Sequence, residues 1–348
     1  MNKDFLEELL TTCSVSGYEE ELQKKVIQNM KPYAEKINTD ATGNVIVSVN
    51  NDSPIKIMLS AHADEIGMIV TKIQGDGSLK VTKAGGVRAA QYLGTHVQIQ
   101  TKNGIVPAVV VTNGTLVNQK DLTCEDLTID IGASSKEEAM QKVQVGDCVC
   151  AATTYQYLMN DRMVARAFDD RIGVYIIMEA LKRAKERGCN NGVYAASTTG
   201  EETTKRGAYW ASQKIKPTCA LVVDVTYTYD YDGVYSSSMG EAKLGLGPVL
   251  CHSSIVSKKM NDLLVECANR KNIPLQWEIC AGLTHTDADK IHFSNDGVAT
   301  ALISIPLRYM HSSIEMLSLS DVENIIELIT EFLCSYNESI ELDTLKEI

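Results

Sequence analysis

Four apolar runs stand out along the chain, and each is too short to form a helix. They occupy residues 55–59, 193–197, 220–225 and 301–306. Short, mostly apolar runs of this kind are typical of strands that are buried on both faces of a parallel sheet. We therefore expect four central strands, and the first of them stops at Ser60-Ala61-His62.

Segments with apolar residues at helical spacing lie before, between and after these runs. The expected helices cover residues 4–12, 16 to about 35, 172–187, 258–270 and 322–336. Ser16 with Glu19, and Ser320 with Glu323, have the spacing of a capping box, which ties down the first turn of a helix. Strands that alternate with helices predict an α/β fold, with a mixed, largely parallel sheet covered by helices on both faces.

Residues 68–160 do not follow this alternation of strands and helices. Short segments of alternating apolar and polar residues, such as 79–82, 95–101 and 106–112, are separated by turn signals, and helical periodicity is weak. This pattern predicts a small all-β domain that is inserted into an α/β domain formed by residues 1–67 and 161–348.

Charge and composition exclude several classes of partner. Acidic side chains outnumber basic ones by 45 to 33, and the formal charge of −12 repels phosphate backbones and anionic lipid. No run approaches the ~20 apolar residues that cross a bilayer, and the N-terminus lacks a signal-peptide pattern. We therefore expect a cytoplasmic protein that binds neither nucleic acid nor membrane.

The ten cysteines form no CxxC pair, and several lie inside apolar runs. We interpret them as reduced core residues. Cys148 and Cys150 alternate as two residues on one face of a strand would, and no second pair follows that could complete a metal site.

Imidazoles and carboxylates follow the predicted central strands where each strand ends. In open α/β sheets, functional groups gather outside the carboxyl ends of the strands. A set of histidines and carboxylates without thiolates suits zinc, cobalt or manganese, and it can hold two ions bridged by one carboxylate and one water. The sequence thus predicts a hydrolytic metal site from His62, Asp64, Asp169, Asp170, Glu201, Glu202, Asp224 and His311.

The spacing of these residues suggests roles for some of them. His62 and Asp64 share a face of an extended segment, so the carboxylate could orient the ligating ring. Glu201 and Glu202 cannot point the same way, so one could bind metal while the other acts as general base. Each motif alone is weak evidence for a metal site. Asp169-Asp170, for example, could simply cap a helix.

Motifs spread along nearly the whole chain resemble those of the tetrahedral, or glutamyl, aminopeptidase family of di-metal exopeptidases, some members of which are labelled cellulase. The matching segments are Ser14-Val15-Ser16-Gly17-Tyr18-Glu19, Ala61-His62-Ala63-Asp64-Glu65-Ile66-Gly67, Ala167-Phe168-Asp169-Asp170-Arg171, Gly200-Glu201-Glu202, Asp224-Val225-Thr226, Thr286-Asp287-Ala288 and Arg308-Tyr309-Met310-His311-Ser312. The chain departs from the family pattern beside these motifs, at Gly200, Thr203-Thr204, Tyr227 and Ser313.

The resemblance implies a zinc-exopeptidase-like fold and removal of the N-terminal residue from short peptides through a metal-bridging water. It implies two divalent ions per subunit, with zinc expected first and cobalt or manganese as alternatives. Asp169 would bridge them, Glu201 would be the general base and Asp64 would orient His62. The implied ligands are His62, Asp169, Glu202, Asp224 and His311.

The resemblance also implies that the inserted domain is a β-barrel that mediates dimerisation, and that dimers assemble into a tetrahedral dodecamer. Two other functions stay open: a glycoside hydrolase, as the cellulase label suggests, and a non-catalytic assembly protein that kept the fold. Polar loops at 227–232 and 282–287 predict a polar substrate pocket, in which His285 could contact an acidic side chain or Asp287 a basic one.

Overall fold

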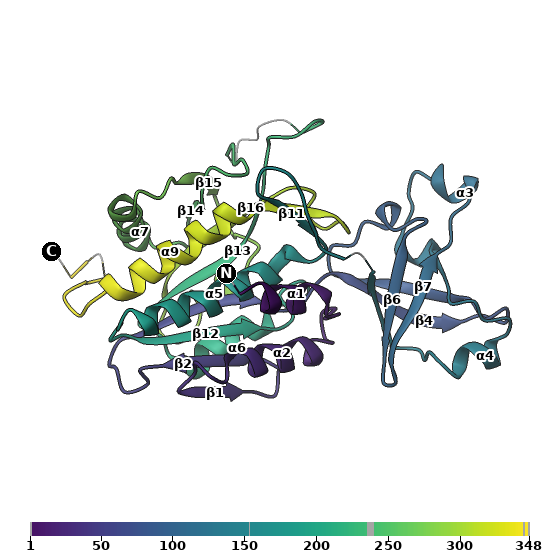
Figure 1. The fold of residues 1–348 in the computed structure, drawn as a ribbon, viewed down its shortest axis with the longest axis horizontal. Helices are drawn as coiled ribbons and strands as arrows, with labels where there is room; N and C mark the ends of the chain where they lie inside the picture. The colour runs from purple at the N-terminus through teal and green to yellow at the C-terminus, as the bar shows by residue number, and fades with distance from the viewer. Residues whose placement is uncertain (1, 153, 235–239, 344, 347–348) are drawn as a thin grey trace.

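A mixed eight-stranded sheet forms the centre of the larger part of the molecule (Figure 1). The computed structural model describes residues 2–152, 154–234, 240–343 and 345–346. In spatial order the strands are β1 (Lys36–Thr39), β2 (Val45–Val49), β12 (Gly192–Thr198), β3 (Lys56–His62), β13 (Cys219–Tyr227), β16 (Ala299–Leu307), β14 (Val249–Ser253) and β15 (Gln276–Cys280).

The four predicted central strands are confirmed as β3, β12, β13 and β16. They are neighbours in the sheet, and all four run parallel to one another. The flanking strands β2 and β14 pair antiparallel with β12 and β16, which makes the sheet mixed. The carboxyl ends of the four parallel strands therefore meet along one edge.

Helices cover both faces of this sheet. Side chains point alternately to the two faces along each strand, so they pack into two separate apolar cores. On β3, Ile57 and Leu59 join the larger core with α5 and α9, whereas Met58 joins the smaller core with α6 and α8. The longer helices are α1 (Lys3–Thr11), α2 (Glu20–Met30), α5 (Phe168–Glu186), α6 (Arg206–Ile215), α7 (Lys258–Lys271) and α9 (Leu319–Ser335). Shorter helical segments are α3 (Gly114–Val117), α4 (Lys136–Met140) and α8 (Ala288–Ile291). The predicted α/β fold is confirmed.

Both predicted capping boxes are wrong. The Ser16 hydroxyl pairs with the Thr203 hydroxyl at 2.9 Å, and Glu19 accepts the backbone N–H of Gly200 at 3.1 Å. Tertiary partners have replaced the local cap, and α2 ends at Met30 because the chain turns into β1. At the start of α9, Glu323 binds the guanidinium of Arg183 instead of the backbone of its own first turn.

The predicted all-β insertion is a closed six-stranded barrel, set beside the larger part of the molecule (Figure 1). Its strands in order are β4 (Gly67–Ile73), β5 (Leu79–Ala84), β8 (Thr128–Asp130), β7 (Gly104–Val110), β6 (His96–Thr101) and β9 (Cys148–Ala151). Alternate residues such as Val97 and Ile99 on β6 point into an apolar interior. A third, small sheet joins β10 (Gln156–Tyr157), β11 (Arg162–Ala165) and β17 (Glu315–Ser318) after the chain leaves the barrel.

A buried ion-pair network lies where the chain enters and leaves the barrel. Glu65, just before β4, binds Arg166, just after β11, and also binds Arg171 in α5. Arg171 donates a further hydrogen bond to the Ser14 hydroxyl at 2.7 Å. Burial alone would raise the pKa of Glu65, but the two guanidiniums outweigh burial and lower that pKa. The network ties both connections of the barrel to the larger domain.

Most cysteines are free and buried, as expected, but Cys280 is half-buried and Cys334 is exposed. Cys148 and Cys150 do share a face of β9, and the Sγ atom of Cys150 lies 2.9 Å from that of Cys13. Among the described residues, no helix combines the length and apolarity that crossing a membrane requires.

The network at the barrel junction predicts a large loss of stability for Glu65→Gln. Both guanidiniums would stay buried without their anion, which costs about 3–5 kcal/mol in comparable cases. Glu323→Gln is the matched control, because the pair of Glu323 with Arg183 is partly exposed and should contribute at most about 1 kcal/mol. Denaturant unfolding of both variants beside the parent checks this, and similar losses for the two would contradict it.

Candidate metal centre

The candidate residues converge at the edge where the parallel strands end. His62 is the last residue of β3, and Asp224 lies near the end of β13. Glu201 and Glu202 follow β12 in a turn, and His311 follows β16. Asp169 enters from the first turn of α5, so five separate segments supply side chains to one site.

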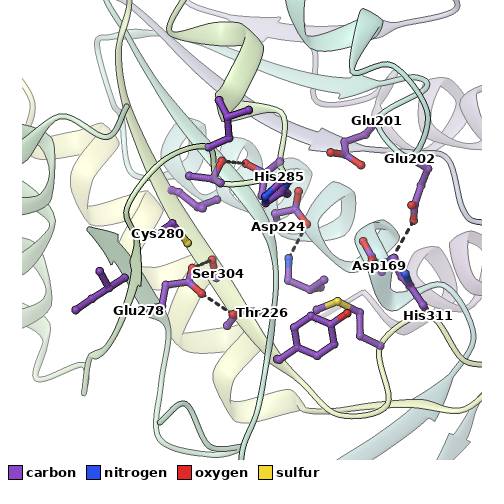
Figure 2. A pocket seen from close by; sticks show the side chains of 18 of the residues that line it. Asp169, Glu201, Glu202, Asp224, Thr226, Glu278, Cys280, His285, Ser304 and His311 are labelled. Carbon is purple, nitrogen blue, oxygen red and sulfur yellow. Dashed lines mark hydrogen bonds and ion pairs between the residues drawn. The ribbon is translucent and has the colours of Figure 1, made fainter. Parts of the chain in front are cut away.

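Asp169 lies between two histidines, of which His311 is drawn beside it in Figure 2. Its Oδ1 is 3.1 Å from Nε2 of His62, and its Oδ2 is 3.1 Å from Nε2 of His311. One carboxylate thus faces two imidazoles with two different oxygens. This is the arrangement that a bridging carboxylate requires.

Each histidine belongs to its own group of possible metal ligands. His62, Asp169 and Asp224 offer ligand atoms that lie within 4.8 Å of one another, and so do Asp169, Glu202 and His311. The structure therefore brings together all five residues predicted as ligands, and Asp169 is common to both groups.

Negative charge in the site exceeds what the protein itself balances. Burial raises the pKa of Glu202 and Asp224, and the nearby charge of Asp169 raises both further. Burial would also raise the pKa of Asp169, but His311 and His62 outweigh it and lower that pKa. Oε1 of Glu202 is buried and has no hydrogen-bond partner among the described residues. Because histidine nitrogens and carboxylate oxygens are the donors that zinc, cobalt and manganese accept, the site fits divalent ions of this kind.

Glu201 differs from Glu202 in direction and in surroundings. Figure 2 shows Glu202 pointing to Asp169 and His311, whereas Glu201 points separately into the cavity. Oε2 of Glu201 is 3.9 Å from Nε2 of His62, and Oε1 of Glu201 is 3.6 Å from Nζ of Lys205. Burial, followed by the charges of Asp287 and Asp169, raises the pKa of Glu201 to about 8. Glu201 therefore lies beside the ligand groups without belonging to either.

Asp64 contacts His62 in a way that its spacing did not reveal. Nδ1 of His62 lies 3.0 Å from the backbone oxygen of Asp64 and 3.5 Å from its carboxylate Oδ1. The carboxylate itself accepts the backbone N–H groups of Glu201 at 3.0 Å and Glu202 at 3.1 Å. Asp64 thus orients the ring through its backbone and fixes the turn of both glutamates through its side chain.

Sequence reasoning missed one supporting carboxylate, Glu315, and assigned no supporting role to another, Asp170. Glu315 on β17 accepts the backbone N–H of Asp169 at 3.1 Å and of His311 at 2.8 Å. Asp170 accepts the backbone N–H of His62 at 3.2 Å, and the peptide bond between Asp169 and Asp170 is cis. Neither aspartate makes a side-chain cap on α5, so the capping interpretation is wrong. Nothing in the local sequence signals a carboxylate that acts on the backbone of a distant residue.

A cavity of about 620 Å³ opens from this centre along β13, β15 and β16. His285 and Tyr227 line it, together with Glu278 and several apolar side chains. Asp287 does not line it, because this residue is buried and accepts hydrogen bonds from Ser60 at 3.0 Å and Thr198 at 2.6 Å. The suggestion that Asp287 contacts a substrate side chain is therefore wrong.

Cys13, Glu65 and Cys150 form a third group of possible ligand atoms among the described residues. Glu65 already binds two guanidiniums there, and burial contributes to raising the pKa of both thiols. The protein's own cations thus balance this group, in contrast to the centre at Asp169.

Comparisons with known proteins agree on one family. The model of the M42 glutamyl aminopeptidase family matches residues 43–328. A putative aminopeptidase of Acetivibrio thermocellus is 37% identical over 95% of this chain and 98% of its own length. A lysyl aminopeptidase of Pyrococcus furiosus is 32% identical over 93% of this chain and 94% of its own.

Solved structures show the same likeness. A TET aminopeptidase from a marine sediment archaeon of the Thaumarchaeota has a TM-score of 0.90 and 31% identity, covering 97% of both chains. The TET1 peptidase of Pyrococcus horikoshii, described as assembling into a tetrahedron or a large octahedral shell, has a TM-score of 0.86 and 30% identity. That match covers 96% of this chain and 99% of the other.

The charge imbalance predicts that metal removal destabilises the protein more at higher pH. In the folded, metal-free protein the pKa values of Glu201, Glu202 and Asp224 lie above the ~4 of unfolded carboxyls. A raised carboxyl pKa stabilises the fold while the group is protonated, and this stability is lost as pH rises through the folded value. The melting-temperature difference between metal-loaded and chelator-treated protein should widen by several degrees from pH 5 to pH 8. A constant difference would contradict the assignment.

Proposed function

Because this chain belongs to the M42 glutamyl aminopeptidase family and is therefore a peptide hydrolase, we propose that it removes the N-terminal residue of short peptides at the centre around Asp169. One observation carries this proposal above all: the two oxygens of Asp169 face separate histidines, each within its own group of ligand atoms. A carboxylate placed in this way serves a pair of ions better than a single one.

We assign two divalent ions to each subunit, zinc first, with cobalt or manganese as alternatives. When bound, two such ions polarise a scissile carbonyl and lower the pKa of a water shared between them. Asp169 would contact both ions. The residues that would hold them are His62, Asp169 and Asp224 on one side, and Asp169, Glu202 and His311 on the other.

Glu201 is assigned as the general base. It points into the cavity beside both ligand groups, and its buried carboxylate belongs to neither of them. A carboxylate in this position can take a proton from the attacking water and return it to the leaving amine. Asp64 and Glu315 position this machinery, because both hold its backbone by hydrogen bonds.

The two other functions gain no support from this geometry. A glycoside hydrolase needs a pair of carboxylates that flank a sugar, and it leaves His62 and His311 without a role. A non-catalytic assembly protein has no use for a cluster of buried carboxylates with raised pKa values, which costs stability. The family match and the names of the relatives favour the peptidase over both.

We further propose that the chain forms dimers through the barrel, and that these build a dodecamer. The inserted domain is assigned to residues 68–160, between catalytic segments 1–67 and 161–348. Several apolar side chains lie exposed on its surface, among them Ile105 and Val109 on β7, which a partner would cover. The shell described for the Pyrococcus horikoshii peptidase is consistent with this assembly. An enclosed chamber would restrict substrates to short peptides.

Glu201 and Glu202 point in different directions, so we expect their substitutions to affect metal content and turnover differently. Glu202→Ala should lose metal and activity together, because an anionic ligand is removed. Glu201→Gln should keep its metal and lose ~100-fold or more in turnover, since the shape is retained and the proton acceptor is gone. The paired measurement is kcat on a chromogenic aminoacyl amide and metal content for both variants beside the parent. Near-parental turnover of Glu201→Gln, or metal loss confined to that variant, would reverse these roles.

The exposed apolar surface of the barrel predicts that the isolated monomer is not the resting state. Light scattering at micromolar concentration should give the mass of a dimer or a multiple of it, with the dodecamer as the expected end point. A monomer that is stable and fully active at this concentration would rule out the proposed assembly.

A further inference from the structure

A buried carboxylate lies in the substrate cavity, away from the proposed metal ligands. Glu278 on β15 lines the cavity and is 9% exposed. Figure 2 shows it on the opposite side of the cavity from Asp169, Glu202 and His311. The proposed chemistry at the metal centre makes no use of this side chain.

Glu278 is held by two hydroxyl groups. The Ser304 hydroxyl donates to Oε1 at 2.6 Å, and the Thr226 hydroxyl donates to Oε2. An ionised carboxylate can accept about four hydrogen bonds, so each oxygen keeps capacity for another donor. The two hydroxyls fix the carboxylate in place without using up its ability to bind a ligand.

The negative charge of Glu278 lacks a cation. Burial raises its pKa and the two hydroxyls only partly oppose this, and no basic side chain among the described residues enters the balance. The network at Glu65 shows the contrasting case, in which two guanidiniums accompany the buried carboxylate. A positively charged ligand group would therefore be stabilised beside Glu278.

The strand register connects Glu278 to the reaction centre. Ser304 on β16 is the direct partner of Asp224 on β13, and neighbouring strands lie about 4.8 Å apart. The serine that holds Glu278 is thus one strand away from a proposed metal ligand. A substrate whose N-terminal residue is bound at the centre would extend its side chain along this wall.

The remaining lining suits a long side chain with a cationic end. Ile279, Leu283 and Met310 add apolar surface to the lining of the cavity, and an aliphatic stem can pack on such surface. Among the described residues that line the cavity there is no lysine or arginine to bind an acidic side chain, and His285 is the imidazole outside the proposed ligand set.

We propose that Glu278 determines specificity by binding the ammonium or guanidinium group of a basic N-terminal residue, so that the preferred substrates begin with lysine or arginine. This assignment rests on the proposed aminopeptidase function and adds the substrate class to it. The names of the family and of its members point to different residues, glutamyl in one case and lysyl in another, so they do not decide the matter.

Two amides that differ mainly in charge test the assignment. Lysyl and norleucyl p-nitroanilides have side chains of similar length, and only the first carries an ammonium group. With the metal-loaded full-length enzyme we expect kcat/KM for the lysyl amide to exceed that for the norleucyl amide by about 10- to 100-fold, the usual effect of a charge-assisted contact. The glutamyl amide should be the poorest substrate.

Glu278→Gln keeps the shape of the side chain and removes its charge. We expect the ratio of lysyl to norleucyl kcat/KM to fall to within about threefold of unity. Glu266→Gln is the matched control, because Glu266 is an exposed glutamate on α7 outside the cavity, and its ratio should not change. The ratio is the readout because a folding defect lowers both rates together.

The outcomes separate this assignment from the proposed function. Inactivity on every amide would overturn the aminopeptidase proposal and the assignment with it. Cleavage of the norleucyl amide without a lysyl preference, or a lysyl preference that survives in Glu278→Gln, would overturn the assignment alone. A glutamyl preference that is lost in His285→Ala would place the specificity on His285 instead.

Discussion

Buried carboxylates converge at Asp169, and among the described residues they face two imidazoles and the ammonium group of Lys205. Burial raises the pKa values of Glu201, Glu202, Asp224 and Glu315, and mutual repulsion adds to this. Such a cluster destabilises the fold unless cations enter it. The four parallel strands, the turn after β12 and the first turn of α5 all serve to hold these groups together, so the metal centre explains why the surrounding structure is built as it is.

Three buried sites in the molecule differ in the positive charge that the protein supplies to balance their carboxylates. At the barrel junction, Arg166 and Arg171 balance Glu65, and the result is a structural tie between domains. At the centre around Asp169, histidines balance the charge only in part, which leaves a role for metal ions. At Glu278, hydroxyl groups alone hold the carboxylate, which leaves a role for a cationic substrate group. We therefore assign a structural role to the first site, catalysis to the second and specificity to the third.

The sequence predicted the sheet and the candidate ligands because both follow from the pattern of parallel strands. Short apolar runs give parallel strands, and the ends of parallel strands meet at one edge, so His62, Asp224 and His311 had to lie close together. Partners distant in the chain could not be predicted in this way. Ser16 and Glu19 have the spacing of a helix cap but bind Thr203 and Gly200 instead.

The backbone contacts of the supporting carboxylates escaped prediction for the same reason. Glu315 holds Asp169 through the backbone, and Asp64 uses its carboxylate on the two glutamates, and neither contact has a local sequence signature. Glu278 lies in an ordinary edge strand beside β14, and its hydrogen bond with Ser304 on β16 holds it at the cavity wall.

The central claim is that one carboxylate serves two ions. Anomalous X-ray diffraction from crystals of the zinc-loaded protein, recorded on both sides of the zinc absorption edge, locates each ion independently of any activity. The account predicts two peaks per chain, one beside His62 and Asp224 and one beside Glu202 and His311, with Asp169 in contact with both. A single peak, or two peaks of which only one contacts Asp169, would contradict it.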